Sequence, residues 1–525
     1  MDIATTSGDG APPRAGRREW TGLAVLTLPT LLLALDMSVL YLALPRLSAD
    51  LGADAVEQLW IMDVYGFMIA GFLVTMGSLG DRIGRRRLLL VGSAAFAAAS
   101  VLAACSTGPA MLIGARAVLG IAGATLMPST LALIGNMFAD ARQRGVAIAV
   151  WMSAFMGGTA VGPLVGGALL EHFWWGSAFL LGVPVMVLLM ATAPFLLPEY
   201  RDPRGGRLDL ASVALSLGAV LPLVYGLKEI ARQGPAAGPA LAAVAGLAVG
   251  ALFVRRQRRL ADPLLDLRLV ADRSIRAGLT IMLLGAVTMV GSFLLISLYL
   301  QLVAGLSPFV AGLWTIPGAV AMVAGTTLSP LAARRLRPAY VLAAGMAVAA
   351  TGLLLIAQVR DSSDVGVLVL GHVVVCFGAG PMGAICTELV LGAAPPERAG
   401  SASAMSETSA EFGIALGVAA LGSLAGAVYR ADLEVPGGVP GDAAAAARGG
   451  ITGAAEAAGR LPGAAGAELL EAARAAFVTG LQVTVVLSAV LAAGLAVLAA
   501  VTLRHLRPTE AAPDGARRDP VPVAD

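Results

Sequence analysis

The sequence predicts an all-α integral membrane protein with fourteen transmembrane helices and both termini in the cytoplasm. Of the 525 residues, 58% are hydrophobic and only 13% are charged, and the mean hydropathy is +0.82. A soluble protein of this length needs more charge to cover its surface. Apolar runs of about twenty residues, each long enough to cross a bilayer, recur along the whole chain. The net charge of +2 gives no reason to expect nucleic-acid binding.

Hydropathy divides the chain into fourteen spans. The first is retained rather than removed as a signal peptide, because its apolar run continues past Ala43 without an evident cleavage site. The third and fourth spans are separated by Ser106-Thr107-Gly108-Pro109, a turn that predicts an antiparallel hairpin. The spans are predicted at 21–45, 58–80, 87–107, 110–133, 145–170, 177–198, 209–228, 237–254, 277–302, 309–332, 339–357, 365–388, 400–428 and 477–503.

Basic residues decide the orientation of these spans. The two termini and every second connection together carry 27 of the 36 basic residues, against 8 on the opposite side and one, Arg116, within a span. An excess of positive charge marks the cytoplasmic side, so residues 1–20 and 504–525 are predicted to be cytoplasmic tails. The external segment at about 429–476 is rich in Gly, Ala and Pro and is predicted to be a spacer or a partly ordered loop, with Leu469–Arg474 as a possible short helix.

Ionisable side chains at membrane depth are costly and therefore usually have a partner or a function. Asp36 lies well inside the first span, where removal from water favours the protonated form of a carboxyl near neutral pH. We expect a role in proton coupling or cation binding; a hydrogen-bonded carboxyl that fixes helix packing is the alternative. Asp63 and Glu388 lie closer to the ends of their spans, where hydration is easier. Arg116, the one basic residue within a span, is expected either to pair with an embedded acid or to contact backbone carbonyls.

Glu407 and Glu411 are four residues apart and share one face of a helix. Two carboxylates so close together resist double ionisation, so we expect a shared proton and coupled titration. The alternative for Glu407 is a hydrated position near the cytoplasmic end, stabilised by the helix N-terminus. The candidate proton-coupling and substrate residues are therefore Asp36, Asp63, Arg116, Glu407 and Glu411.

The cytoplasmic connection between the second and third spans carries a Gly-Asp-Arg pattern. Its glycines allow two helix ends to approach closely, and Asp81 can accept hydrogen bonds from an Arg or from the N-terminus of a neighbouring helix. Such a contact would form in one conformation and break in another, whereas a plain positive-inside loop would explain only the arginines. The candidate gating residues are Gly77, Gly80, Asp81, Arg82, Gly84, Arg85 and Arg86.

The fifth span contains small residues about four apart, which permit close helix packing, and a proline that permits a bend. These residues are Gly158, Gly162, Pro163, Gly166 and Gly167. Alone they are a common packing device.

Together these motifs resemble the major facilitator superfamily over almost the whole chain. The connection at 77–87 is similar to the signature loop of this superfamily. The stretch from Leu112 to Gly123 resembles its fourth-helix motif, which is implicated in proton coupling. The glycines of the fifth span resemble its antiporter motif. Leu35-Asp36-Met37-Ser38-Val39 resembles the first-helix motif of fourteen-span drug:proton antiporters. Trp174–Phe179 and Glu407–Gly413 are similar to exporters of quaternary ammonium compounds and methyl viologen.

The resemblance implies the major facilitator fold, with six-helix bundles at 21–198 and 277–503 and two extra helices at 209–254. It implies a proton-coupled exporter of hydrophobic, often cationic compounds in the bacterial inner membrane, energised by the proton gradient without a cofactor, and we expect a monomer in contact with membrane lipid. The family also includes exporters of endogenous antibiotics. The sequence departs from the family pattern at Gly182, where an Asn is frequent. It also has no acid between Asp272 and Asp361, which argues against divalent cations as substrates.

Two rival classes are weighed against export. A nutrient facilitator or importer could use the same fold. A membrane enzyme or receptor is disfavoured because the sequence has no P-loop, no His-Glu-x-x-His motif and no soluble catalytic domain. The three histidines, His172, His372 and His505, are scattered and predict no metal site.

Overall fold

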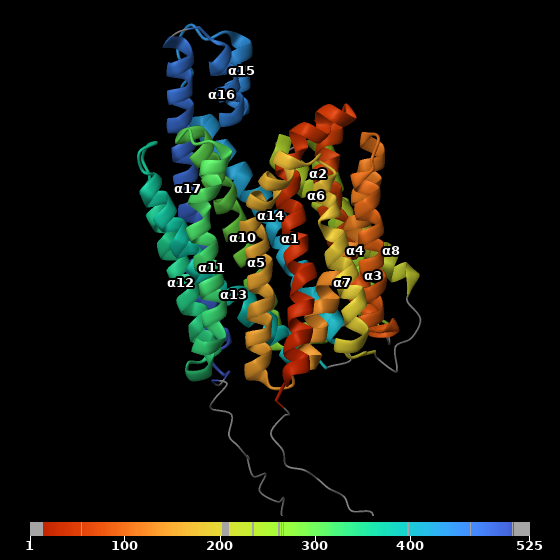
Figure 1. The fold of residues 1–525 in the computed structure, drawn as a ribbon. Helices are drawn as coiled ribbons and strands as arrows, with labels where there is room; N and C mark the ends of the chain where they lie inside the picture. The colour runs from red at the N-terminus through yellow and green to blue at the C-terminus, as the bar shows by residue number, and fades with distance from the viewer. Residues whose placement is uncertain are drawn as a thin grey trace, which may run out of the picture.

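The structure, a computed structural model, describes residues 14–53, 55–201, 209–233, 236–260, 263, 265, 267–395, 398–462, 464–506 and 508. Every regular element within these residues is helical. The predicted tails at 1–13 and 509–525 lie outside the described residues, so only their inner ends can be placed. α1 begins and α17 ends at the same end of the molecule (Figure 1), as an even number of crossings requires.

The first bundle contains six membrane crossings. The sixth is formed by the short α6 and by α7 in succession, separated only by Leu181, whose backbone angles are themselves helical. The helices are α1 (Arg17–Leu51), α2 (Ala55–Ile83), α3 (Arg85–Ala104), α4 (Pro109–Met137), α5 (Ala141–His172), α6 (Ser177–Leu180) and α7 (Gly182–Leu196).

The second bundle repeats this plan. The short η1 (Leu269–Ala271) precedes it, and the π-helical η2 (Tyr299–Val303) continues its first helix. Its helices are α10 (Arg273–Leu298), α11 (Pro308–Arg335), α12 (Pro338–Ile356), α13 (Val365–Ala393), α14 (Ala399–Asp432) and α17 (Ala464–Thr502).

Thirteen segments of the described residues are long and apolar enough to cross a membrane. Part of α5 lies outside the described side chains, so this helix is not counted among the thirteen. It packs along α1 and α11 in the centre of the molecule and completes the fourteen predicted crossings. Its arginines, Arg142 and Arg144, stand in its first turn, before its apolar stretch begins.

Helix packing in the two bundles follows one pattern. α1 packs on α5 and α7, and α10 packs correspondingly on α14 and α17. Likewise α4 contacts α2 and α3, and α13 contacts α11 and α12. Between the bundles, α2 lies against α14 and α5 against α11. The bundles are therefore structural repeats that meet through equivalent helices, as in many secondary transporters.

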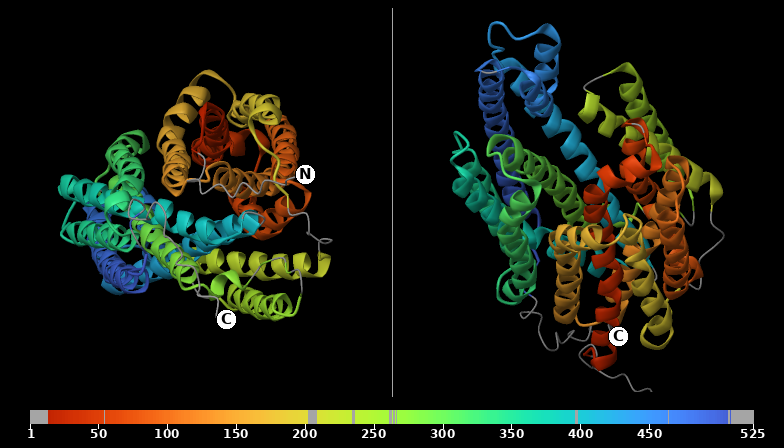
Figure 2. Two further views of the ribbon diagram at one scale, coloured as in Figure 1. Left: turned by 90° about the horizontal axis from the view of Figure 1, so that it is seen from below. Right: turned by 45° about the horizontal axis from the view of Figure 1, so that its top comes forward.

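The extra pair, α8 (Leu210–Gln233) and α9 (Ala237–Gln257), lies beside the junction of the bundles (Figure 2). α8 packs on both α2 and α14, whereas α9 packs mainly on α8. Phe67 of α2, Val220 of α8 and Ala415 of α14 belong to one buried cluster. The extra pair is thus attached to both bundles through α8.

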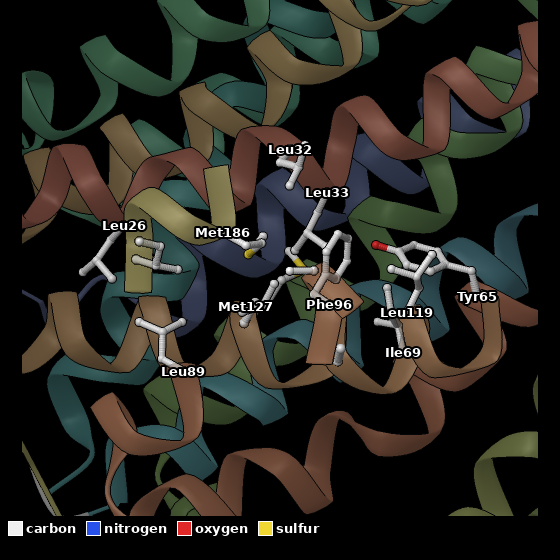
Figure 3. Packing of buried hydrophobic residues seen from close by; sticks show 14 of the residues in the cluster. Leu26, Leu32, Leu33, Tyr65, Ile69, Leu89, Phe96, Leu119, Met127 and Met186 are labelled. Atoms are coloured by element: carbon white, nitrogen blue, oxygen red, sulfur yellow. The ribbon is translucent and has the colours of Figure 1, made fainter. Parts of the chain in front are cut away.

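Each bundle has its own aliphatic core. In the first bundle, Leu33, Phe96, Met127 and Met186 converge from four different helices, with Tyr65 at one edge of the group (Figure 3). Because lipid tails are as apolar as these side chains, close van der Waals packing rather than removal from water holds the helices together here. Separate cores allow each bundle to keep its own packing if the two move relative to each other.

The external segment at about 429–476 differs from the loop that the sequence predicts. α14 continues to Asp432, α15 (Gly441–Gly449) and α16 (Ile451–Arg460) form a helical hairpin, and α17 already begins at Ala464, so Leu469–Arg474 lies within a long helix. The hairpin stands above α17 (Figure 1) and is held by a hydrogen bond of 2.9 Å from the Tyr429 hydroxyl to the Ala447 carbonyl. The prediction was wrong because the many alanines, which resemble a spacer, are also the best helix formers.

Candidate functional site

An ion pair joins the first and fourth helices of the first bundle. Arg116 Nη1 lies 2.7 Å from Asp36 Oδ2, and the two side chains are only 1% and 9% exposed. The guanidinium also donates through Nε to the Ile61 carbonyl at 3.2 Å. Arg116 therefore has both of the partners that the sequence offered as alternatives, an embedded acid and a backbone carbonyl. A buried charge pair of this kind is stable only while both partners stay charged and hydrogen-bonded.

Tyr65 packs against this pair. Its ring lies 4.4 Å from the Arg116 guanidinium carbon, a cation–π geometry. The Tyr65 hydroxyl is buried and has no hydrogen-bond partner among the described residues. Tyr65 thus covers one face of the Arg116 guanidinium, beside its contact with Asp36.

Glycines allow the helices around this pair to approach closely. A Cβ atom on Gly120 of α4 would lie 2.7 Å from Met68 Cβ and overlap the Tyr65 backbone, and one on Gly158 of α5 would lie 2.8 Å from Ala34 Cβ. Gly120 therefore fixes α4 against α2, and Gly158 fixes α5 against α1, on either side of Asp36. Gly166 plays the same part against Val39 about two turns further along α5.

The remaining residues of the predicted antiporter motif are only partly described. Gly162 is buried on α5. The packing of Pro163 and Gly167 lies outside the described part of the structure, so their predicted effect on α5 stays a prediction.

The other acids are distributed along the interface. Glu407 and Glu411 lie on α14, both half-buried, and the charge of Glu411 acts on Glu407. This is the proximity that their spacing predicts. Asp63 is half-buried on α2, two residues before Tyr65. Of the predicted residues, Asp36 and Arg116 are in direct contact.

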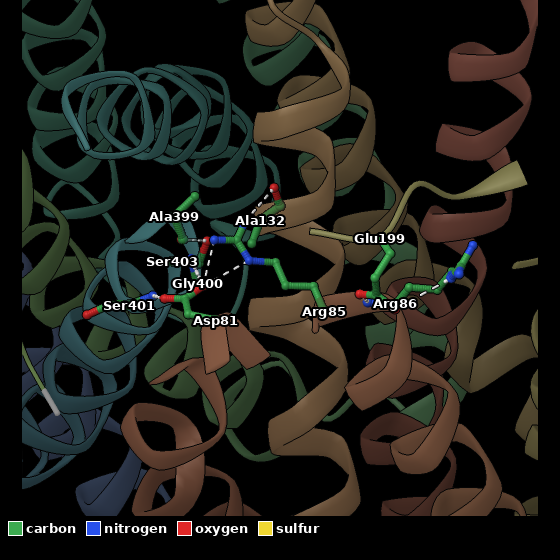
Figure 4. A network of polar contacts seen from close by, with 9 residues as sticks. All are labelled: Asp81, Arg85, Arg86, Ala132, Glu199, Ala399, Gly400, Ser401 and Ser403. Carbon is green, nitrogen blue, oxygen red and sulfur yellow. Dashed lines mark hydrogen bonds and ion pairs between the residues drawn. The ribbon is translucent and has the colours of Figure 1, made fainter. Parts of the chain in front are cut away.

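The predicted gating residue Asp81 lies at the cytoplasmic junction of the bundles. Its carboxylate accepts hydrogen bonds from the backbone N–H groups of Gly400 at 3.0 Å and Ser401 at 2.9 Å (Figure 4). These groups belong to the first turn of α14, where backbone donors have no partner within the helix. Because the Arg398 N-cap supplies no side-chain cap, an acid from the other bundle caps this helix. The contact joins α2 of the first bundle to α14 of the second at this end of the molecule.

Arg85 holds Asp81 in place. Its Nε and Nη2 atoms lie 2.9 and 2.6 Å from Asp81 Oδ1, and its Nη1 donates to the Ala132 carbonyl at 3.2 Å. Arg85 is 1% exposed. A buried charge-assisted network of this kind orients the carboxylate toward α14.

Close backbone contact makes the glycines of this motif necessary. A Cβ on Gly77 would lie 2.7 Å from the Gly400 carbonyl, and a Cβ on Gly400 would overlap Asp81 Oδ1. Gly80 is less crowded, since a Cβ there would lie 3.2 Å from the Leu88 side chain. Gly84 has φ +109°, a conformation that favours glycine. α2 and α14 could not come this close with larger residues.

Arg86 ties the connection to the end of α7. Its backbone N–H donates to Glu199 Oε1 at 3.1 Å, and its guanidinium donates to the Leu197 carbonyl at 3.0 Å. Glu199 was not predicted as a site residue, because an acid that follows a span is usually a solvated loop residue. Arg82 is half-exposed and lies at the end of α2.

A second charged contact crosses between the bundles at the same end. Arg144 of α5 lies 4.0 Å from Glu388 of α13. Further along α5, the hydroxyls of Ser153 and Thr327 are 3.2 Å apart, joining α5 to α11. The sequence places Glu388 near the end of its span, where hydration is easy, and names no partner for it. Only the fold shows that α5 begins beside Glu388 and brings Arg144 to it. Within the described residues, no group of three or more metal-ligating side chains is found.

Two bundles of equivalent helices, with charged side chains buried between them and a latch at one end, define a multi-pass membrane transporter. The chain belongs to the Major Facilitator Superfamily, whose family description matches residues 26–418. It is 44% identical over 504 residues to the multidrug efflux pump LfrA of Mycolicibacterium smegmatis, covering 95% of this chain and all of that protein.

Two further comparisons agree with this family. The chain is 34% identical to the methyl viologen resistance protein SmvA of Salmonella typhimurium, covering 88% of this chain and 93% of that protein. The human organic anion transporter MFSD10 has the same fold, with a TM-score of 0.58 and 18% identity over 90% of this chain and 99% of that one. This last likeness concerns the fold alone.

Proposed function

We propose that this protein exports hydrophobic, often cationic compounds across the bacterial cell membrane in exchange for protons. One observation carries the proposal: the carboxylate of Asp36 is held almost out of water against Arg116, and the ring of Tyr65 covers the Arg116 guanidinium. Relatives that are named for multidrug efflux and methyl viologen resistance support the direction of transport and the kind of substrate.

The proposed cycle begins with the cytoplasmic side opening. Release of Asp81 from the N-terminus of α14 separates the bundles there, and a cationic substrate enters and competes for the deprotonated acids Asp36, Glu407 and Glu411. After the latch closes again, protons from outside displace the substrate by neutralising these acids. A substrate or proton can drive this change only through its different affinity for the two states.

An exporter dedicated to one endogenous compound would use the same site and differ only in substrate range. A nutrient importer on the same fold would move its substrate in the opposite direction. Both alternatives can be separated from multidrug export by measuring range and direction together.

The experiment is a susceptibility and accumulation panel in a host that lacks its own pumps. Cells expressing the protein should accumulate less of several unrelated cationic dyes, and a protonophore should remove the difference. Protection against a single compound would indicate a dedicated exporter. Increased accumulation, or efflux that persists without a proton gradient, would contradict the proposal.

A further inference from the structure

The cytoplasmic connection between α9 and α10 surrounds a cavity of about 490 Å³ that the transport cycle above does not use. We infer that this cavity binds the headgroup of an anionic phospholipid from the cytoplasmic leaflet. Arg258, Arg268 and Arg276 all contribute to its wall. Its volume lies in the range of about 300–1,000 Å³ that is usual for small-molecule sites.

The charge of this region is strongly positive. Residues 255–276 contain seven arginines and three aspartates. Arg256 is bound to Asp209 at 2.8 Å, and Asp272 caps α10 through the N–H groups of Ser274 and Ile275. The wall of the cavity, as far as the described residues define it, carries three guanidinium groups and no acid. Guanidinium groups recognise phosphate oxygens through paired hydrogen bonds.

The apolar part of the wall favours a lipid over a free anion. Val254 and Leu267 line the cavity beside the arginines. On α9, Leu247, Val254 and Arg258 follow one another at spacings of seven and four and so share a face of the helix. Leu247 is 60% exposed, as expected for a side chain that faces acyl chains. A lipid can therefore place its phosphate at Arg258 and its tails along α9.

The connection is fixed in place by a buried polar side chain. Gln257, which is 2% exposed, donates to the Ser212 hydroxyl at 2.7 Å and accepts from the Leu265 N–H at 3.3 Å. This anchors the connection against α8, so that the cavity exists before a ligand arrives. Because Arg258 follows α9 and Arg276 lies in the first turn of α10, a bound headgroup would join the extra pair to the second bundle.

The test compares two double variants with the same change of charge. Arg258→Gln with Arg276→Gln removes two arginines from the wall, whereas Arg255→Gln with Arg259→Gln removes two exposed arginines of the same segment that do not line it. The full chain is purified in a neutral detergent. Native mass spectrometry then measures binding of phosphatidylglycerol, of phosphatidylcholine and of inorganic phosphate.

The unaltered protein and the Arg255/Arg259 variant should retain phosphatidylglycerol equally. The Arg258/Arg276 variant should bind it at least tenfold more weakly, the loss expected from one charge-assisted hydrogen bond. The inference would be overturned if both variants lost phosphatidylglycerol binding equally. It would also be overturned if the unaltered protein retained phosphatidylcholine as well as phosphatidylglycerol. Phosphate binding strong enough to displace phosphatidylglycerol would show a site for free anions and would overturn it as well. Matching thermal unfolding of the two variants checks that both are folded, and no transport measurement enters the test.

Discussion

Asp81 and Gly400 belong to different bundles, and the carboxylate of Asp81 accepts a hydrogen bond of 3.0 Å from the Gly400 backbone N–H. The helix N-terminus gains a negative partner, and the partially positive end of α14 favours the charged carboxylate. Because the contact uses backbone atoms, it depends on how closely α2 approaches α14. Gly400 and Gly77 set that distance, since neither position has room for a Cβ atom.

Replacing Gly400 by Ala should therefore weaken the cytoplasmic latch. The added methyl group overlaps Asp81 Oδ1, and loss of hydrogen bonds to a charged acceptor costs about 1.5–3 kcal/mol each. The fraction of molecules closed at this side should fall by tenfold or more. The readout is cross-linking of Ser153→Cys to Thr327→Cys, whose native hydroxyls are 3.2 Å apart across the bundles, in a background without the exposed Cys105.

The matched control for this variant is Gly422→Ala on the same helix. Nothing lies within 4 Å of a Cβ atom at Gly422, so cross-linking should remain at the level of the unaltered protein. If Gly400→Ala and Gly422→Ala gave the same cross-linking yield, Asp81 and α14 would not form a latch.

Asp36→Asn should abolish efflux that depends on the proton gradient, by at least tenfold, because Asn cannot exchange a proton. The Asn amide oxygen can still accept a hydrogen bond from Arg116. The loss of folding stability should therefore stay below the roughly 3–5 kcal/mol that breaking a buried ion pair costs. Dye efflux with and without a protonophore is measured beside the amount of protein in the membrane. Asp50→Asn, at an exposed position on the same helix, should transport normally. Normal gradient-driven efflux by Asp36→Asn would remove Asp36 from the coupling mechanism.

Tyr65→Phe should leave thermal stability unchanged or raise it slightly. The hydroxyl is buried without a partner among the described residues, and the ring that covers Arg116 is kept. Tyr65→Ala, in contrast, should cost about 3–5 kcal/mol, since it removes the ring from a packed position. Thermal unfolding of purified protein compares the two. A large loss of stability in Tyr65→Phe would mean that the hydroxyl has a partner that the static structure lacks.

The extra helix pair should show a dependence on acid pH. Hydrogen bonds from Ser212 and Arg256 lower the pKa of Asp209 below its ordinary value. A carboxyl with a lowered pKa in the folded state contributes stability above its unfolded pKa of about 3.9, and this is lost as the pH falls through the folded value. At neutral pH, Asp209→Asn should lower the stability of the α8–α9 pair by about 1 kcal/mol, as the loss of a helix cap typically does. Amide hydrogen exchange in α8 and α9 should become faster as a result.

Below pH 4 the exchange rates of the Asp209→Asn variant and the unaltered protein should converge. Asp442→Asn, an exposed acid in the first turn of α15, serves as the control and should leave α8 and α9 unchanged at every pH. A difference that persisted undiminished in acid would show that the charge of Asp209 does not stabilise the pair.

The sequence by itself determined the membrane class, the fourteen crossings and the side on which the termini lie. These follow from hydropathy and from the distribution of arginine, which act locally on each span and need no knowledge of the packing. It also singled out Asp36, Arg116 and Asp81, because a charge at membrane depth or at a helix junction stands out against an apolar background.

Only the tertiary structure decided which charges meet. Asp36 and Arg116 are 80 residues apart, and Asp81 and Gly400 are 319 apart, so no local pattern pairs them. Glu199 and Glu388 carried no strong signal, because the approach of α7 and of α5 gives them their partners. The alanine-rich hairpin was missed because its helices are stabilised by packing on α14 and α17, which composition alone does not reveal.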